Sequence, residues 1–178
     1  MAARKRWLIT AMVLGMCGCV SIPDIYAPSI ERKPLTGPEQ SAVGPVVGMS
    51  DSNADAHIVR DISRTVEGGG WRWVHQRPEL RFILGTTENL KFIMDFSVPE
   101  TTFRDTGPIK ISVFINDRLL DTVAVDKPGN RRFEKPVPGA WLRNDAVTKV
   151  VAEVDKPWIA PADGAKLGFI LSRAGFVQ

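Results

Sequence analysis

Cysteine and histidine are scarce in this sequence of 178 residues. Its two cysteines, Cys17 and Cys19, both lie near the amino terminus, and its two histidines, His57 and His75, are well separated. Zinc sites place their Cys and His ligands at short, recognisable spacings, and no such spacing is present. We therefore expect no metal site built on these residues.

The signatures of common enzyme classes are also missing. The sequence has neither the G-x-S-x-G pattern of a nucleophilic serine nor the G-x-x-x-x-G-K pattern of a phosphate-binding loop. The run Gly68-Gly69-Gly70 leads into a predicted strand, without the following helix whose amino terminus would hold a phosphate. No acidic pair has an informative spacing, so we expect a protein that is not an enzyme and needs no cofactor.

The apolar run near the amino terminus is too short to cross a membrane. Residues 8–16 provide about nine residues, whereas a spanning helix needs roughly 20. The run follows Arg4, Lys5 and Arg6, and a short apolar run behind positive residues is typical of a secretory signal. We interpret residues 1–18 as a signal peptide.

The apolar run ends in Met16-Cys17-Gly18-Cys19. This segment resembles the bacterial lipobox, in which apolar and small residues precede an obligatory cysteine. Cys19 fits better than Cys17, which would need the large Met16 at the cleavage position. The resemblance implies a lipoprotein anchored to a membrane by a lipid such as palmitate on Cys19. An ordinary cleaved signal and an uncleaved anchor helix are the alternatives. The residue that follows Cys19 is Val20 and not Asp. By the same resemblance, this implies an anchor in the outer membrane, with the chain facing the periplasm or the cell surface.

The net charge of +3 belongs to the signal. Its three basic residues leave with residues 1–18, which contain no Asp or Glu, so the mature chain is formally neutral. The basic pI is therefore no indication of nucleic acid binding, and we expect no nucleic acid partner. Cleavage before Cys19 would also remove Cys17, which excludes an internal disulfide.

Residues 19–52 are rich in proline and glycine and show no sustained helical or strand period. The residues concerned are Pro23, Pro28, Pro34, Pro38, Pro45, Gly37, Gly44 and Gly48. Because proline removes a backbone donor and fixes φ, the segment predicts an extended tether. Packing of part of it along the domain is the alternative, since Ile22, Ile25 and Tyr26 are apolar.

Residues 53–178 form a stretch of about 125 residues, an ordinary length for one domain. Apolar residues alternate with polar ones within 71–75, 80–84, 90–96, 109–115, 123–125, 147–154 and 167–177. This period of two predicts about eight short strands, and hence an all-β single sandwich of jelly-roll or Greek-key type. Turns are expected at 116–117, 128–130 and 138–139. Residues 56–62 fit a strand or one short helix, and we favour the strand.

The tryptophans of the predicted first long strand raise a question of orientation. Trp71, Trp73 and His75 share one face of a regular strand, with Arg72 on the other. A tryptophan on an alternating strand usually fills the core, so we expect at least one of the two to be buried. Lysines such as Lys91 and Lys110 are expected on a solvated face.

From Pro108 onward the chain has a recognisable order of motifs: Asn116-Asp117, Pro138 to Leu142, Asp155 to Asp163, and Leu167-Gly168. This order resembles a β-sandwich module attached to some bacterial glycosyltransferases, methyltransferases and lipoproteins, which is itself similar to galactose-binding-like jelly rolls and carbohydrate-binding modules. Asn116-Asp117 departs from the more usual Asn-Gly. The resemblance implies a binding domain of largely unassigned role.

The candidate ligand-binding residues are aromatic and acidic. Trp158 lies between two prolines with Asp155 and Asp163 nearby, and Trp141 lies in the Pro138 segment. Aromatic rings suit the apolar C–H faces of sugars, while polar neighbours fix orientation. A structural role for each of these tryptophans is the alternative.

Two functions fit these features. The first is a noncatalytic envelope lipoprotein that binds glycan. The second is a structural or assembly lipoprotein that binds protein partners in an envelope or export complex, which a contiguous exposed apolar patch would favour. A hydrolase has no specific support.

Overall fold

The computed structural model describes residues 43–178. The expected signal peptide, the expected lipidation site Cys19 and most of the expected tether lie outside the described residues. The strands are β1 (Val46–Gly48), β2 (Ile58–Ile62), β3 (Arg72–Ile83), β4 (Lys91–Val98), β5 (Ile109–Ile115), β6 (Arg118–Val125), β7 (Gly129–Pro136), β8 (Val147–Val154), β9 (Trp158–Ile159), β10 (Lys166–Leu167) and β11 (Ile170–Val177). The helices are α1 (Ala54–His57), α2 (Glu100–Thr106) and the 3₁₀ turn η1 (Gly139–Trp141). Within this part of the chain, no helix is long and apolar enough to span a bilayer.

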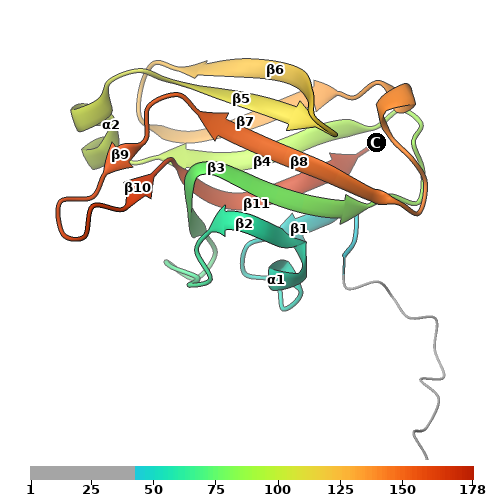
Figure 1. Cartoon of the computed structure of the whole chain (residues 1–178), viewed down its shortest axis with the longest axis horizontal. Coiled ribbons are helices and arrows are strands. Elements are labelled where there is room, and N and C mark those ends of the chain that lie inside the picture. Colours follow the sequence, from blue (N-terminus) through green and yellow to red (C-terminus); the bar gives the residue numbers. More distant parts are fainter. Residues whose placement is uncertain (1–42) are drawn as a thin grey trace, which may run out of the picture. The chain divides into compact units, whose positions relative to one another are not determined.

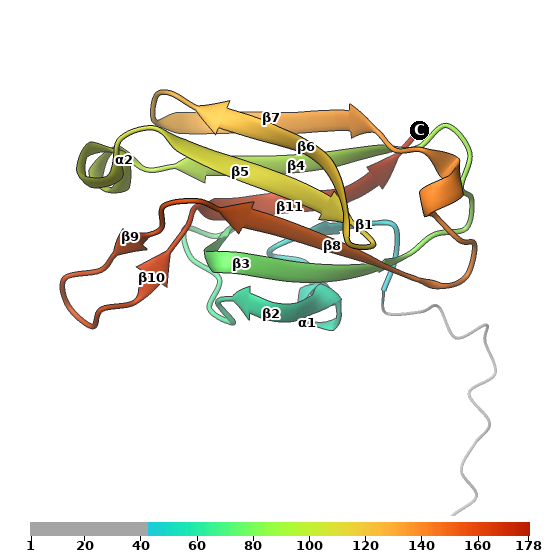
Figure 2. The ribbon, with the colours of Figure 1, turned by 45° about the horizontal axis from the view of Figure 1, so that its top comes forward.

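The strands form an antiparallel sandwich that approaches a barrel (Figures 1 and 2). Pairing runs β6-β5-β8-β3-β11-β4-β7, with β1 added along β11 and β2 along β3. β3 joins the two layers, because its first residues pair with β11 and its last with β8. β6 and β7 are the two end strands of this order, and Lys135 of β7 forms an ion pair with Asp121 of β6 at 2.6 Å. The predicted all-β sandwich is confirmed, and eight of these strands have five or more residues.

Regular alternation builds the core. In β5, Ile109, Ile111, Val113 and Ile115 are buried, whereas Lys110 is exposed. Phenylalanines from three strands meet in the interior, with Phe176 of β11 at 5.6 Å from Phe82 and 5.4 Å from Phe92 between ring centroids. These edge-to-face contacts stabilise the layers without a disulfide.

Trp71 and Trp73 lie opposite Arg72 as expected, but their face is not the core, so the expectation that at least one of them is buried is wrong. β3 is one strand of 12 residues in which even-numbered positions point inward, so that Arg72 and Val74 are buried and Trp73 is only half-buried. Trp71 is also half-buried and meets Trp73 edge to face at 6.0 Å. The inward positions of Val74, Leu80 and Phe82 share one parity, which forces the tryptophans to the other face.

The domain begins before residue 53. β1 pairs with β11 through Val46, Val47 and Gly48, and the side chains of Val47 and Met49 are fully buried. Gly175 makes this pairing feasible: its φ is +153°, and a Cβ there would lie 2.5 Å from the Pro45 carbonyl oxygen. The tether boundary at 52 is therefore a correction, because apolar residues among the prolines complete the sheet.

The connections follow the predicted turns closely. Asn116 and Asp117 have φ of +48° and +66°, as a two-residue hairpin turn of type I′ requires, between β5 and β6. Residues 126–128 connect β6 to β7, and Pro138 leads into η1. Residues 56–62 contain both expected elements, since α1 ends at His57 and β2 follows directly.

Candidate functional site

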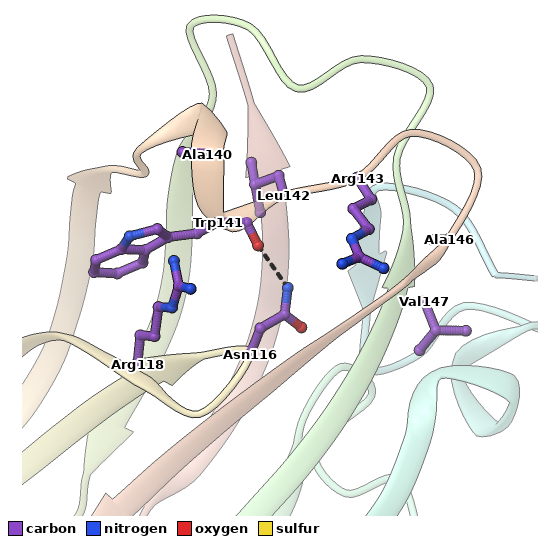
Figure 3. A pocket seen from close by; sticks show the side chains of 8 residues that line it. All are labelled: Asn116, Arg118, Ala140, Trp141, Leu142, Arg143, Ala146 and Val147. Carbon is purple, nitrogen blue, oxygen red and sulfur yellow. Dashed lines mark hydrogen bonds between the residues drawn. The ribbon is translucent and has the colours of Figure 1, made fainter.

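A cavity of about 340 Å³ opens at the end of the sandwich where the β5–β6 turn, η1 and the loop of residues 143–146 meet (Figure 3). Its lining consists of Asn116, Arg118, Ala140, Trp141, Leu142, Arg143, Ala146 and Val147. The lining combines apolar walls with two guanidinium groups. The surface offered to a ligand is more polar than in most small-ligand sites, which are lined mainly by apolar groups.

Asn116 holds the cavity together. Its side-chain amide donates to the Trp141 carbonyl oxygen at 2.8 Å, and its amide oxygen accepts from the Lys149 backbone N–H at 2.9 Å. One side chain thus joins the β5–β6 turn to η1 and to β8. Each polar atom of this side chain makes one hydrogen bond within the protein, so Asn116 positions the wall of the cavity.

Trp141 supports an arginine. The Arg118 guanidinium lies 5.7 Å from the centroid of the indole, within cation–π range, and the half-buried indole also packs against the core. The indole is therefore not an open platform. The Arg118 guanidinium makes no ion pair or hydrogen bond within residues 43–178, so its N–H groups are available for a ligand.

The two arginines of the cavity have no acidic partner among residues 43–178. Arg118 contacts the indole, and Arg143 takes part in no ion pair or hydrogen bond within that part of the chain. The eight lining residues include no Asp or Glu. The neighbouring Asp117 is already bonded to Lys149 at 2.6 Å. The cavity therefore carries uncompensated positive charge.

A second cavity, of about 500 Å³, lies over β4, β7 and β11 and differs in charge. Its Arg132 makes two bonds to Asp95, at 2.6 and 2.8 Å, and its Arg131 bonds Asp126 at 3.1 Å. The hydrogen bond from Arg132 lowers the pKa of the Asp95 carboxyl below its ordinary value. These arginines are neutralised within the protein, and the Phe96 ring in the lining is buried.

The residues expected to bind ligand do not gather in one place. Trp141 lines the first cavity, but Trp158, Asp155 and Asp163 lie in or just before the β9–β10 hairpin, at the opposite end of the sandwich in both views (Figures 1 and 2). The four residues therefore do not form a single site.

The three residues near the hairpin make bonds within the protein. The Trp158 indole N–H donates to Asp105 of α2 at 2.8 Å. Asp155 accepts from the Lys110 backbone N–H at 2.8 Å, which extends the pairing of β8 with β5. Asp163 accepts from the Ala165 N–H at 3.0 Å within the hairpin loop. These bonds shape the hairpin and its connection to α2.

Sequence reasoning missed Arg118 and Arg143 and treated Asn116 only as a turn residue. A signal was present: arginines follow both Asn116-Asp117 and Trp141-Leu142 within two residues. Nothing in the sequence placed these two segments side by side, because the contact depends on the β5–β8 pairing.

Comparisons with known proteins return no family. No protein-family model matches the sequence, and no curated protein is significantly similar to it. Among solved structures, an acetyl xylan esterase from the rumen bacterium Butyrivibrio proteoclasticus matches over 75% of this chain at 11% identity, with a TM-score of 0.43. An exo-β-1,3-galactanase from Phanerochaete chrysosporium matches over 76% at 8% identity, with a TM-score of 0.40.

A third structure contains CBM51-2 in complex with GlcNAc and the INT domains of ZmpB from Clostridium perfringens. It matches over 74% of this chain at 12% identity, with a TM-score of 0.36. The matched regions make up 32%, 29% and 28% of the three solved chains. Similarities of this size assign neither a family nor a function, so function has to be inferred from the chain's own side chains.

Proposed function

We propose that this chain is a noncatalytic, lipid-anchored protein of the cell envelope whose sandwich domain binds a glycan in the cavity beside η1. The cavity carries the proposal, because it joins apolar walls to free guanidinium donors. Sugars present both kinds of surface, with apolar C–H faces and hydroxyl acceptors. A volume of about 340 Å³ lies at the lower end of the range for small-ligand sites.

The noncatalytic part of the proposal is supported by the chemistry of the lining. Hydrolysis of a glycosidic bond ordinarily uses two carboxyl groups on opposite sides of that bond. The eight lining residues provide none, nor a hydroxyl, thiol or imidazole. A bound sugar would meet no side chain in the lining that could act as an acid, a base or a nucleophile.

The anchor and the location remain proposals from the sequence. Lipid on Cys19 would hold the domain at a membrane, which we propose is the outer membrane. Metabolic labelling with a radioactive fatty acid tests this: wild-type protein is expected to incorporate label, and Cys19→Ser is not. Equal labelling of Cys19→Ser would contradict the anchor.

An assembly role is the alternative, and the exposed apolar residues give it little support. The exposed large hydrophobics among residues 43–178 are Val59, Val66, Leu119, Val147 and Ile159. They come from five different strands or loops, whereas a protein-docking surface usually has a contiguous apolar patch.

A glycan array tests the proposed function. The full chain in detergent micelles is expected to bind at least one glycan, and Arg118→Ala with Arg143→Ala is expected to abolish that binding. Trp158→Ala is the matched control, since Trp158 lies at the other end of the sandwich, and it should retain binding. Loss of binding in Trp158→Ala alone would move the site to the hairpin. Absence of binding to every glycan would disprove the function.

A further inference from the structure

The charge of the cavity beside η1 narrows the class of ligand. Arg118 comes from the first residue of β6, and Arg143 from the loop before β8. In Figure 3 the Arg118 side chain rises beside the indole and the Arg143 side chain descends from the loop, with Asn116 between them. Two guanidinium groups from separate segments thus line one concave surface.

Nothing in the lining compensates this charge. Asp145 belongs to the same loop as Arg143 but does not line the cavity, and Asp117 is bonded to Lys149. By contrast, the second cavity holds two arginines that are both paired with aspartates. Since like charges repel, two unpaired guanidinium groups beside one cavity raise its affinity for an anion.

The contact with Trp141 also orients the Arg118 guanidinium. Its guanidinium is held over the Trp141 indole, and Asn116 fixes the backbone of Trp141 through the 2.8 Å bond. A guanidinium that is already oriented loses less side-chain entropy on binding, and its planar fork matches the paired oxygens of a carboxylate or a sulfate. Trp141 and Asn116 therefore act as positioning residues.

We propose that the glycan bound in this cavity is anionic, with carboxylate or sulfate ester groups that contact Arg118 and Arg143. The inference rests on the proposed glycan-binding function and specifies its ligand. Leu142, Ala146 and Val147 provide the apolar wall for the sugar ring, and the solvent-exposed Val147 lies at the rim.

The test uses the full chain in detergent micelles and isothermal titration calorimetry. The probes are oligogalacturonate, oligoglucuronate and a sulfated galactan oligomer, each beside its neutral counterpart made by carboxyl reduction or desulfation. At least one anionic probe is expected to bind, with its neutral counterpart at least tenfold weaker. Which of the probes binds separates carboxylate from sulfate recognition. Raising the salt concentration from 50 to 500 mM should weaken the interaction.

Variants locate the interaction. Arg118→Ala and Arg143→Ala are each expected to weaken binding at least fivefold, and Arg143→Lys to weaken it less because the charge is retained. Arg131→Ala is the matched control, since that half-buried arginine is paired with Asp126 and does not line this cavity, and it should bind as wild type does.

Three results would overturn the inference. If neutral oligomers bind as tightly as anionic ones, the ligand class is wrong while the proposed function stands. If an anionic probe binds equally to Arg118→Ala and Arg143→Ala, the site is wrong. If no probe binds and the glycan array is also blank, both the inference and the proposed function are wrong.

Discussion

Arg72 and Arg143 occupy opposite situations in one domain. Arg72 is 5% exposed, and its guanidinium donates to the Met49 carbonyl at 2.8 Å and to Asp55 at 2.6 Å. Arg143 is exposed and has no such partner among residues 43–178. Burial of an arginine is tolerated only when its donors are satisfied, which is why the β1–α1 segment closes over Arg72.

The comparison separates structural from functional polar groups. Around Arg72 every donor and acceptor serves the fold, since no buried side-chain polar atom of the described residues lacks a partner. The positive charge of Arg143 has no partner within the described residues, so an anionic ligand can bind to it. The following four changes test this division.

The largest effect is expected for Arg72→Ala. The change leaves the Met49 carbonyl buried without a donor and opens a void under β1, so the free energy of unfolding should fall by about 2–4 kcal/mol. Urea denaturation of the full chain measures it. Arg72→Met, which keeps the volume but not the hydrogen bonds, should cost less. Wild-type stability in Arg72→Ala would show that Arg72 does not hold β1.

A smaller loss is expected for Asn116→Gly. Glycine tolerates the positive φ at this position, so the change isolates the two side-chain bonds to Trp141 and Lys149. Two such bonds contribute about 1–2 kcal/mol in total. The same urea titration applies, with the exposed Asn144→Gly as control. Equal effects of the two changes would argue against Asn116 as the support of the cavity.

His57 is expected to make the free energy of unfolding depend on pH. Its Nδ1 faces the Arg81 carbonyl at 3.0 Å and so carries the proton, while Nε2 accepts from the Gly44 N–H at 3.3 Å. Burial lowers the pKa of His57 below its ordinary value of 6.5. Below that pH the unfolded chain binds a proton that the folded state resists, so stability is complete above about pH 6.5 and falls as the pH drops through the lowered pKa.

Protonation would remove the acceptor for Gly44, a bond that contributes about 0.5–1.5 kcal/mol. Denaturation midpoints between pH 7.5 and 4.5 measure the loss, in a range above the ordinary pKa of 3.8 for Asp55, Asp95 and Asp121, each of which is lowered further. His57→Gln should flatten the dependence of the denaturation midpoint on pH. A profile that His57→Gln does not alter would exclude this histidine as its cause.

The smallest effect on stability is expected for Arg143→Ala. Because Arg143 has no partner within the described residues, the free energy of unfolding should stay within about 0.5 kcal/mol of wild type. Thermal unfolding by circular dichroism measures it. A loss of stability comparable to that of Arg72→Ala would show that Arg143 is a structural residue, and the contrast between Arg72 and Arg143 would then be wrong.

Local pattern predicted much of the fold. The alternation in 109–115 and 147–154 and the turn at Asn116-Asp117 appear where they were expected, since strand period and turn chemistry depend on neighbouring residues. The burial of Trp71 and Trp73 was misjudged, because Arg72 and not a tryptophan occupies the inward face of β3. Met49 and Asp55, the partners of Arg72, come from a segment more than ten residues upstream, and part of that segment had been interpreted as tether.

The candidate site was predictable only in part. Trp141 was singled out for its aromatic ring, but its use as a support for Arg118 depends on a contact across the turn of another hairpin. Trp158 was singled out for the same reason, but its indole N–H donates a hydrogen bond to Asp105 of α2. Residue type alone does not distinguish these two environments.

The sequence by itself determined the all-β class and most strand and turn positions, because these follow from a period of two and from residues that favour turns. It also led us to expect an anchor at Cys19. Only the tertiary structure decided which arginine is buried and which lines a cavity, because both outcomes depend on partners that pairing of distant strands brings into contact.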